Sequence, residues 1–208
     1  FEEELRLSEK SIGDLYEITS SNELNFDEKQ RALLRMGCQR FGMEIGYILQ
    51  LKRENFELLH LYSSNGFTVD VTNLDMNQGF GREVVRQQRT VMVEDVVGTP
   101  LEHLVGYRDY HLRSYIGAPL MVGGQLFGVL SFASKLPRQA PFTQAEARFL
   151  HLMAQWIGLE RERNQYLMQL HQNSEDLLNK SLELAAARDQ ALELSQMKSD
   201  FLATMSHE

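Results

Sequence analysis

The sequence predicts an α+β fold, in which an antiparallel sheet flanked by helices precedes one long helix that forms a parallel dimeric coiled coil. Three observations support this prediction. Apolar residues recur at helical spacing near the N-terminus and alternate with polar residues between 46 and 63. The stretch 115–133 is uncharged and rich in residues that favour strands. From Gln144 to Glu208, Gly158 is the only residue that strongly disfavours a helix.

Local patterns predict each element in turn. The first helix begins with acidic residues, which the helix dipole favours. Two hairpins are expected because paired apolar segments flank short turns at Glu54-Asn55 and Gly123-Gly124. The expected elements are a helix at 2–19, a helix at 26–40, a hairpin at 46–63, a short helix at 78–88, a strand at 90–96, a short helix at 101–111, a hairpin at 114–133 and the long helix from 144.

Composition limits the partners and the compartment. Lysine and arginine number 21 against 29 aspartate and glutamate, a net charge of −8, which argues against a nucleic-acid surface. The single cysteine, Cys38, fits a reducing cytosol, and we expect it to be a small buried residue. Residues 115–133 are long enough to cross a bilayer, but Pro119 and the central glycines favour the hairpin and no membrane span. We expect a cytoplasmic protein, although the parent could be tethered to a membrane upstream.

The long helix needs a partner. About 65 residues give roughly 95 Å of helix, which is not stable alone in water. Steps of four and three residues, alternating, give a mainly apolar seam with polar positions at Asn173, Lys180 and Lys198, which indicates a homodimeric coiled coil. The apolar seam residues are Tyr166, Leu170, Leu177, Leu184, Ala191, Leu194, Phe201 and Met205.

Residues 198–208, KSDFLATMSHE, resemble the first-helix motif of the dimerisation and phosphoacceptor (HisKA) domain of histidine kinases. The resemblance implies that His207 is the phosphoacceptor and that Glu208 is its orienting acid or base. A neutral imidazole is a usable nucleophile, and Glu208 is placed to accept from Nδ1–H and so favour attack by Nε2. His207 follows the seam residue Met205 by two positions, which places it off the seam and within reach of solvent.

Residues 20–160 resemble a GAF domain through the segments GFGREVVRQQRTVMVEDV, LRSYIGAPLMVGGQLFGVLSF and PFTQAEARFL. The cyclic-nucleotide signature of that family, Asn-Lys…Phe-x-x-x-Asp-Glu, is replaced by Ser-Lys…Phe-x-x-x-Glu-Ala, so we do not expect cyclic-nucleotide binding. Lys135 and Glu146 of this segment are instead expected to form a structural ion pair. A covalent bilin is not expected, because the usual Cys-His is Glu102-His103 here. Non-covalent tetrapyrrole binding stays open.

A ligand pocket is expected between the sheet and the two short helices, and His103 and His111 are expected on one face of the second of them. Two interpretations stay open: the aromatic residues line a pocket, or they fill the core. No metal site is expected, since no metal-spaced cluster occurs in residues 1–160. The candidate lining residues are Phe80, His103, Tyr107, Tyr110, His111, Tyr115 and Phe132.

Together these resemblances imply the sensory input and signal-transmission fragment of a two-component sensor histidine kinase. The implied cofactor of the full-length kinase is ATP, and the implied partner is a response-regulator receiver domain. The fragment lacks an ATP-binding domain, so we expect it to be inactive alone. The alternatives are a ligand- or pigment-binding GAF module, with a non-covalent bilin or haem, and a degenerate GAF domain that acts as a dimerisation spacer. The expected segments are an N-terminal helix at 1–19, a GAF sensory domain at 20–160, a coiled-coil linker helix at 161–197 and the truncated start of the phosphoacceptor helix at 198–208.

Overall fold

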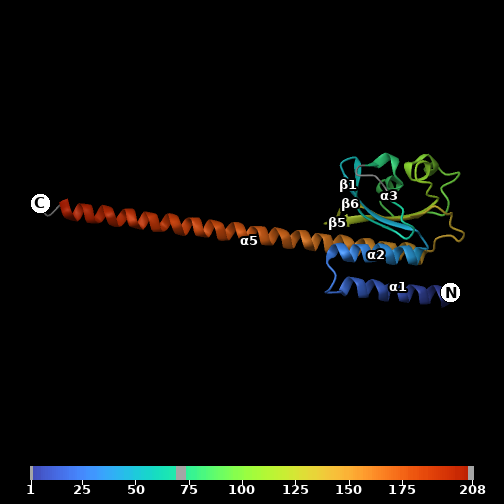
Figure 1. Ribbon diagram of the computed structural model, residues 1–208, viewed down its shortest axis with the longest axis horizontal. Helices are drawn as coiled ribbons and strands as arrows, with labels where there is room; N and C mark the ends of the chain where they lie inside the picture. Colours follow the sequence, from blue (N-terminus) through green and yellow to red (C-terminus); the bar gives the residue numbers. More distant parts are fainter. Residues whose placement is uncertain (1, 69–73, 206–208) are drawn as a thin grey trace. The chain divides into compact units, whose positions relative to one another are not determined.

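The computed structural model describes residues 2–68 and 74–205 (Figure 1). The chain divides into two compact units, Phe1–Glu162 and Arg163–Glu208. Their elements are α1 Glu2–Ser20, α2 Phe26–Phe41, β1 Ile45–Lys52, β2 Asn55–Ser63, β3 Leu74–Asp75, the 3₁₀ helix η1 Met76–Gln78, α3 Gly81–Gln87, β4 Val91–Val93, the 3₁₀ helix η2 Pro100–His103, α4 Val105–Arg108, β5 Ser114–Val122, β6 Gln125–Ser134 and α5 Gln144–Met205.

The sheet has six strands in the order β3-β2-β1-β6-β5-β4, and all neighbours are antiparallel. Both predicted hairpins are confirmed. Gly123 and Gly124 form the two-residue turn between β5 and β6, with φ values of 58° and 76°, as the common hairpin turn requires. Pairing of β1 with β6 joins the two hairpins at the centre of the sheet. The two-residue edge strand β3 has no counterpart in the sequence prediction.

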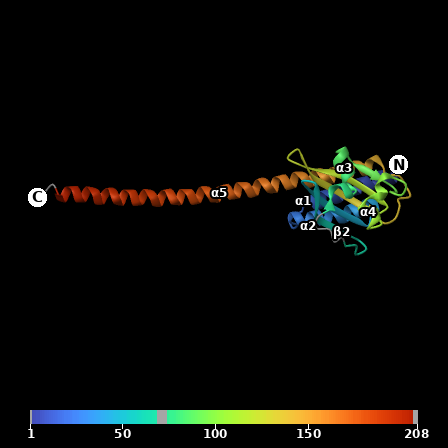
Figure 2. The same cartoon turned by 90° about the horizontal axis from the view of Figure 1, so that it is seen from above.

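Helices cover both faces of this sheet. In Figure 1, α3 lies on one face, while α2 and the first part of α5 lie on the other; seen from above in Figure 2, these layers overlap. Successive residues of a strand point to opposite faces, so each strand supplies two separate cores. One core, with Ile116 and Phe132, packs against α2 and α5. The other, with Tyr115 and Ala133, packs beneath α3 and α4.

Helix α2 confirms the predicted helix at 26–40, and a capping residue at each end explains where it begins and ends. The Asn25 side chain accepts from the Glu28 backbone N–H at 3.0 Å, and the Asn25 N–H donates to the Glu28 carboxylate at 2.8 Å. This reciprocal cap satisfies two groups that a helix start leaves unpaired. Gly42 ends the helix at φ 64°, in the left-handed region that favours glycine. Cys38, within α2, is buried in the core, as predicted.

Helix α5 runs from Gln144 to Met205 and includes the one glycine that its sequence pattern left unexplained. A Cβ atom at Gly158 would lie 2.0 Å from the carbonyl oxygen of Met121. Glycine is therefore needed here because the helix touches the backbone of β5. Among the described helices, none combines the length and apolarity that a membrane crossing requires.

The predicted single helix at 101–111 is wrong. Leu104 has an extended backbone, with φ −82° and ψ 154°, and separates η2 from α4. The structure therefore places His103 at the end of η2 and His111 beyond the end of α4, so the two do not share a helical face. His111 has a φ of 58°, a left-handed conformation that ends this segment.

Candidate functional site

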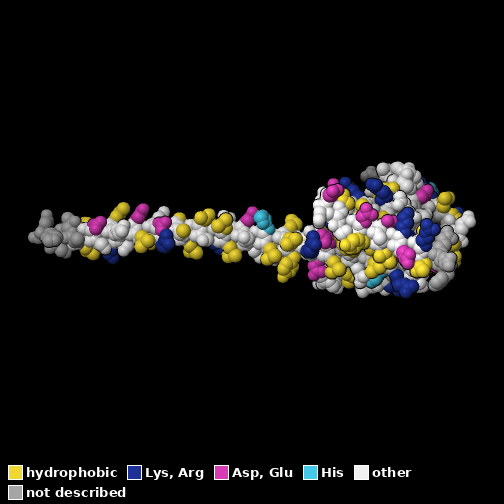
Figure 3. Space-filling model, turned by 90° about the horizontal axis from the view of Figure 1, so that it is seen from below, with side chains coloured by type: hydrophobic (Ala, Val, Ile, Leu, Met, Phe, Trp, Pro, Cys, Tyr) yellow, Lys and Arg dark blue, Asp and Glu magenta, His cyan; other side chains and the backbone are white. Residues whose placement is uncertain are grey.

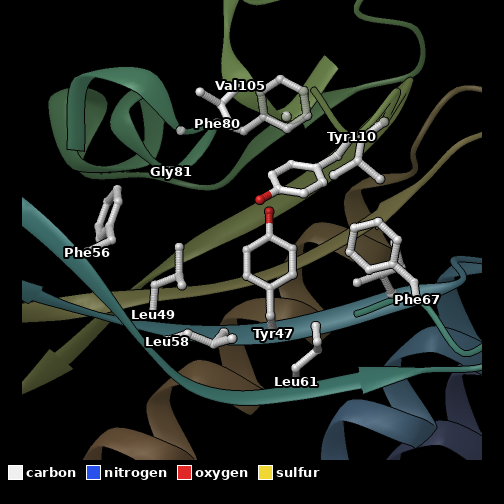
Figure 4. Close-up of a pocket in the computed structure, with 14 residues that line it drawn as sticks. Tyr47, Leu49, Phe56, Leu58, Leu61, Phe67, Phe80, Gly81, Val105 and Tyr110 are labelled. Carbon is white, nitrogen blue, oxygen red and sulfur yellow. The ribbon is translucent and has the colours of Figure 1, made fainter. Parts of the chain in front are cut away.

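A cavity of about 70 Å³, partly open to solvent, lies between the β1–β2 hairpin and the segments around α3 and α4 (Figure 4). Alternate residues of β1 supply one wall, since their side chains share a face of the sheet. β2 adds Phe56, Leu58 and Leu61, the last two on either side of a shift in the strand register. The lining residues are Ile45, Tyr47, Leu49, Phe56, Leu58, Leu61, Phe67, Gly79, Phe80, Gly81, Val105, Gly106, Tyr110 and Leu112.

Phe80 is held at the side of this cavity by close packing. A Cβ atom at Gly106 would lie 2.6 Å from the Phe80 ring, so only glycine lets α4 approach so closely. On its other side, the Phe80 ring packs edge-on against Tyr115, with 5.3 Å between ring centroids. Phe80 is therefore fixed between a helix backbone and the sheet, which preforms this wall.

The only polar side chains among the described lining residues are Tyr47 and Tyr110, whose hydroxyls point toward one another (Figure 4). Burial raises the pKa of Tyr47 and raises that of Tyr115 well above its usual range. Both phenols therefore stay protonated at neutral pH. Tyr115 lies beneath the lining, where its hydroxyl is 2.9 Å from the Ser131 hydroxyl. The cavity is thus an uncharged, mainly apolar site whose polar groups are two tyrosine hydroxyls.

The structure brings only two of the seven predicted pocket residues into the lining, Phe80 and Tyr110. Tyr107 packs against the same core without lining the cavity, and Tyr115 lies behind Phe80. The placement of the other three is corrected. His103 and His111 are exposed, because the segment that carries them is not one inward-facing helix. Phe132 points to the opposite face of the sheet, where its ring lies 5.0 Å from that of Phe41.

The sequence prediction missed the strand residues of this site. Tyr47 and Leu49 on β1, and Phe56 and Leu58 on β2, line the cavity. The alternating pattern of the hairpin contained this signal, since it places these residues together on one of its two faces. The pattern did not say which face a ligand would meet.

A family model for the GAF domain matches residues 25–160, which is well over half of the chain. This chain belongs to the GAF family. No curated protein shows a significant match to it. The GAF domain is a sensory and ligand-binding module of signalling proteins, and the fold described above is the GAF fold.

Solved structures share this fold at low sequence identity. A free methionine-R-sulfoxide reductase from Neisseria meningitidis, in complex with its substrate, is 20% identical, with a TM-score of 0.61 over 76% of this chain and 92% of its own. The GAF domain of an Acinetobacter phosphoenolpyruvate-protein phosphotransferase is 18% identical, with a TM-score of 0.57 over 74% and 90%. A far-red-absorbing protein with bound biliverdin IXa is 14% identical, with a TM-score of 0.60 over 77% and 99%. At these identities the likeness establishes the fold alone.

The GAF domain does not form the expected ion pair between Lys135 and Glu146. Glu146 instead accepts from Arg138 at 2.7 Å, and its carboxylate also accepts from the Thr143 backbone N–H at 2.8 Å. Because Glu146 is the third residue of a reciprocal cap at the start of α5, its carboxylate is turned back toward the preceding loop. Lys135 lies over the ring of Phe67, 5.4 Å from its centroid.

The second unit carries the predicted seam. Figure 3 shows hydrophobic side chains along this helix, and the seam residues from Tyr166 to Met205 are exposed in the single chain. His207 and Glu208 lie outside the described residues. Within residues 2–68 and 74–205, no three His, Cys, Asp or Glu side chains are grouped so as to hold a metal ion.

Proposed function

We propose that this chain is the sensory input and signal-transmission part of a two-component sensor histidine kinase. One observation carries the proposal: residues 198–205, which begin the HisKA-like motif, lie in the same helix, α5, that begins within the GAF domain. The GAF domain is the sensor, residues 161–197 are the signalling helix, and His207 is the phosphoacceptor. This role belongs to the cytoplasm, where ATP and the receiver domain are available.

The proposed chemistry is a phosphoryl transfer. Nε2 of His207 attacks the γ-phosphorus of ATP, which is bound by the kinase's ATP-binding domain, and the bond to the bridging oxygen breaks, so ADP leaves. Glu208 accepts a hydrogen bond from Nδ1–H, which keeps the lone pair on Nε2 and stabilises the charge that develops on the ring. The phosphoryl group then passes to an aspartate of a response-regulator receiver domain.

Substitution of His207 tests this assignment in the full-length kinase. We expect His207→Gln to abolish incorporation of acid-labile phosphate from ATP, and Glu208→Gln to lower its rate by about 10²–10⁴. His171 is a matched control, because it lies on the same helix with its Nε2 3.3 Å from the Glu175 carboxylate. His171→Gln should leave phosphorylation unchanged. Full phosphorylation of the His207→Gln protein would refute the assignment.

A homodimer through the seam is the second part of the proposal. Large apolar side chains exposed in a row along a helix favour pairing with a second copy. Leu177 and Leu178 provide a matched test, because they are 68% and 62% exposed but only Leu177 lies on the seam. We expect Leu177→Glu to shift the protein to monomer in analytical ultracentrifugation, and Leu178→Glu to leave the dimer intact. A monomeric wild-type protein at tens of micromolar would contradict the coiled coil.

The cavity favours an active sensor over a degenerate spacer, because small-ligand sites are mainly apolar pockets with a few polar groups. It does not favour a tetrapyrrole. Its volume of about 70 Å³ is well below the several hundred Å³ of typical larger-ligand sites. Purified protein should therefore show no visible absorption band, and a Soret or bilin band would reverse this choice.

A further inference from the structure

We infer that the cavity binds a small uncharged ligand, namely a single aromatic ring that carries one hydroxyl group. This inference deepens the sensory role proposed above and rests on it for its biological meaning. It is carried by three properties of the described lining: the absence of charged side chains, the facing tyrosine hydroxyls and the presence of five aromatic rings among its fourteen residues.

Because the described lining has no charged side chain, the cavity disfavours anionic and cationic ligands. The described lining contains no Asp, Glu, His, Lys or Arg side chain, and a phenol ordinarily has a pKa near 10. The nearby cations already have partners. Arg108 pairs with Asp109 and Arg113 with Asp95, and the Lys135 ammonium lies over the ring of Phe67. A buried carboxylate or phosphate without a counter-charge is strongly disfavoured. Nucleotides and the propionate groups of tetrapyrroles are therefore poor occupants.

The facing hydroxyls provide the polar contact. Figure 4 shows the hydroxyls of Tyr47, from β1, and Tyr110, which follows α4, pointing toward one another between the lining residues. A phenol oxygen has one donor and two acceptor positions, so each tyrosine keeps capacity for a further hydrogen bond even when it has one partner. A ligand hydroxyl, which also donates and accepts, matches this pair better than a group that only accepts.

The aromatic rings of the lining determine the shape of the apolar part of the cavity. Phe56, Phe67 and Phe80 join the two tyrosines around the cavity, and aromatic rings pack favourably edge-on or offset against one another. An apolar cavity of about 150 Å³ can bind benzene, which is roughly twice the present volume. The ring most able to give way is that of Phe67, which is partly exposed and meets Tyr110 edge-on at 5.7 Å between centroids. Entry of a ligand would thus separate Phe67 from Tyr110.

Two probes of the same size but different charge test the inference on the 208-residue chain. Benzyl alcohol is neutral, whereas benzoate is an anion at pH 7. We expect benzyl alcohol to raise the melting temperature in a concentration-dependent way, as a ligand of the folded state must, and to shift the backbone amide resonances of Gly81 and Gly106. Benzoate should do neither.

Two hydroxyl deletions locate the contact. Tyr47→Phe should weaken the binding of benzyl alcohol about 3- to 10-fold, as expected for loss of one hydrogen bond. Tyr62→Phe is the matched control, because Tyr62 is on β2 but packs against the core on the other face of the sheet. It should leave the affinity unchanged.

Equal binding of benzoate and benzyl alcohol would overturn the inference, as would no binding of benzyl alcohol or an equal loss in both tyrosine variants. If Tyr47→Phe fails to fold, the resonance shifts in the wild-type protein still decide between the cavity and another surface. None of these measurements involves His207. A failure here is therefore distinguishable from failure of the phosphoacceptor assignment, which only the kinase assay reports.

Discussion

The contact between α5 and the backbone of β5 makes a sharp prediction about Gly158. In a free helix, replacing glycine by alanine stabilises by about 1 kcal/mol, because alanine loses less conformational entropy on folding. In this protein the new Cβ atom would lie 2.0 Å from the Met121 carbonyl oxygen. The helix and strand would have to separate by about 1 Å to relieve this overlap, since backbone atoms have no alternative rotamer.

The expected result is a net loss of stability. Overpacking a well-packed core costs about 1–3 kcal/mol, and a backbone contact belongs at the upper end of that range. After subtraction of the helical gain, we expect Gly158→Ala to lower the free energy of unfolding by about 2 kcal/mol. For a unit of this size the corresponding fall in melting temperature is about 4–8 °C.

Urea denaturation followed by tryptophan fluorescence measures this change. Trp156 is the single tryptophan and lies in α5 next to the contact, with its ring 6.2 Å from that of Phe26. Gly13→Ala in α1 is the matched control, because a Cβ there meets nothing within 4 Å. The control should gain up to about 1 kcal/mol. A Gly158→Ala protein at least as stable as the wild type would refute the close approach of α5 to β5.

Three further predictions concern a thiol, a histidine and the proposed dimer. Burial raises the pKa of the Cys38 thiol to about 12. Cys38 should therefore resist a thiol reagent at pH 8 in the folded protein and react with it in denaturant. Equal reaction rates in the folded and denatured protein would contradict this. Burial outweighs the opposing charge of Asp27 and lowers the pKa of His60. Below the unfolded-state pKa of about 6.5 the unfolded chain therefore binds more protons, and stability should fall as the pH drops from 7.5 to 5.5. This fall should be smaller in His60→Gln, and identical urea titrations in both proteins would exclude a role for His60. In a parallel dimer, Glu183 and the Arg188 of the second copy occupy facing positions beside the seam. Arg188→Glu should weaken the dimer, and adding Glu183→Arg should restore it. If sedimentation of the double variant shows no restored dimer, the proposed parallel register is wrong.

The elements of this fold were predictable where their signals are local. The two hairpins and α2 follow from alternating residues, a glycine pair and a capping sequence that need no distant partner. The long helix was predictable for the same reason, although the role of Gly158 was not. Its partner, the Met121 carbonyl, is 37 residues away in the chain (158 − 121), and no sequence pattern marks that approach.

The site was only partly predictable, because its walls come from distant segments. Phe80 and Tyr110 were identified because they are aromatic residues within the two predicted short helices. Phe132 was misplaced because β6 is buried on both faces, and a continuous apolar run does not reveal which residues face which layer. Tyr47 was missed because its role depends on how the hairpin meets α4.

The burial of β5 also bears on how this domain could acquire a different specificity. Its residues from Ser114 to Leu120 are all buried, so this part of the strand has no position at which a side chain can change without disturbing one of the two cores. Substitutions in β2 meet fewer constraints, because all but one of its residues are only partly buried. Variation in ligand preference should therefore accumulate in β2 and the loop after α4, while the strand beneath them stays fixed. A library that randomises Leu58 and Leu61 would vary the wall of the cavity and leave β5 unchanged.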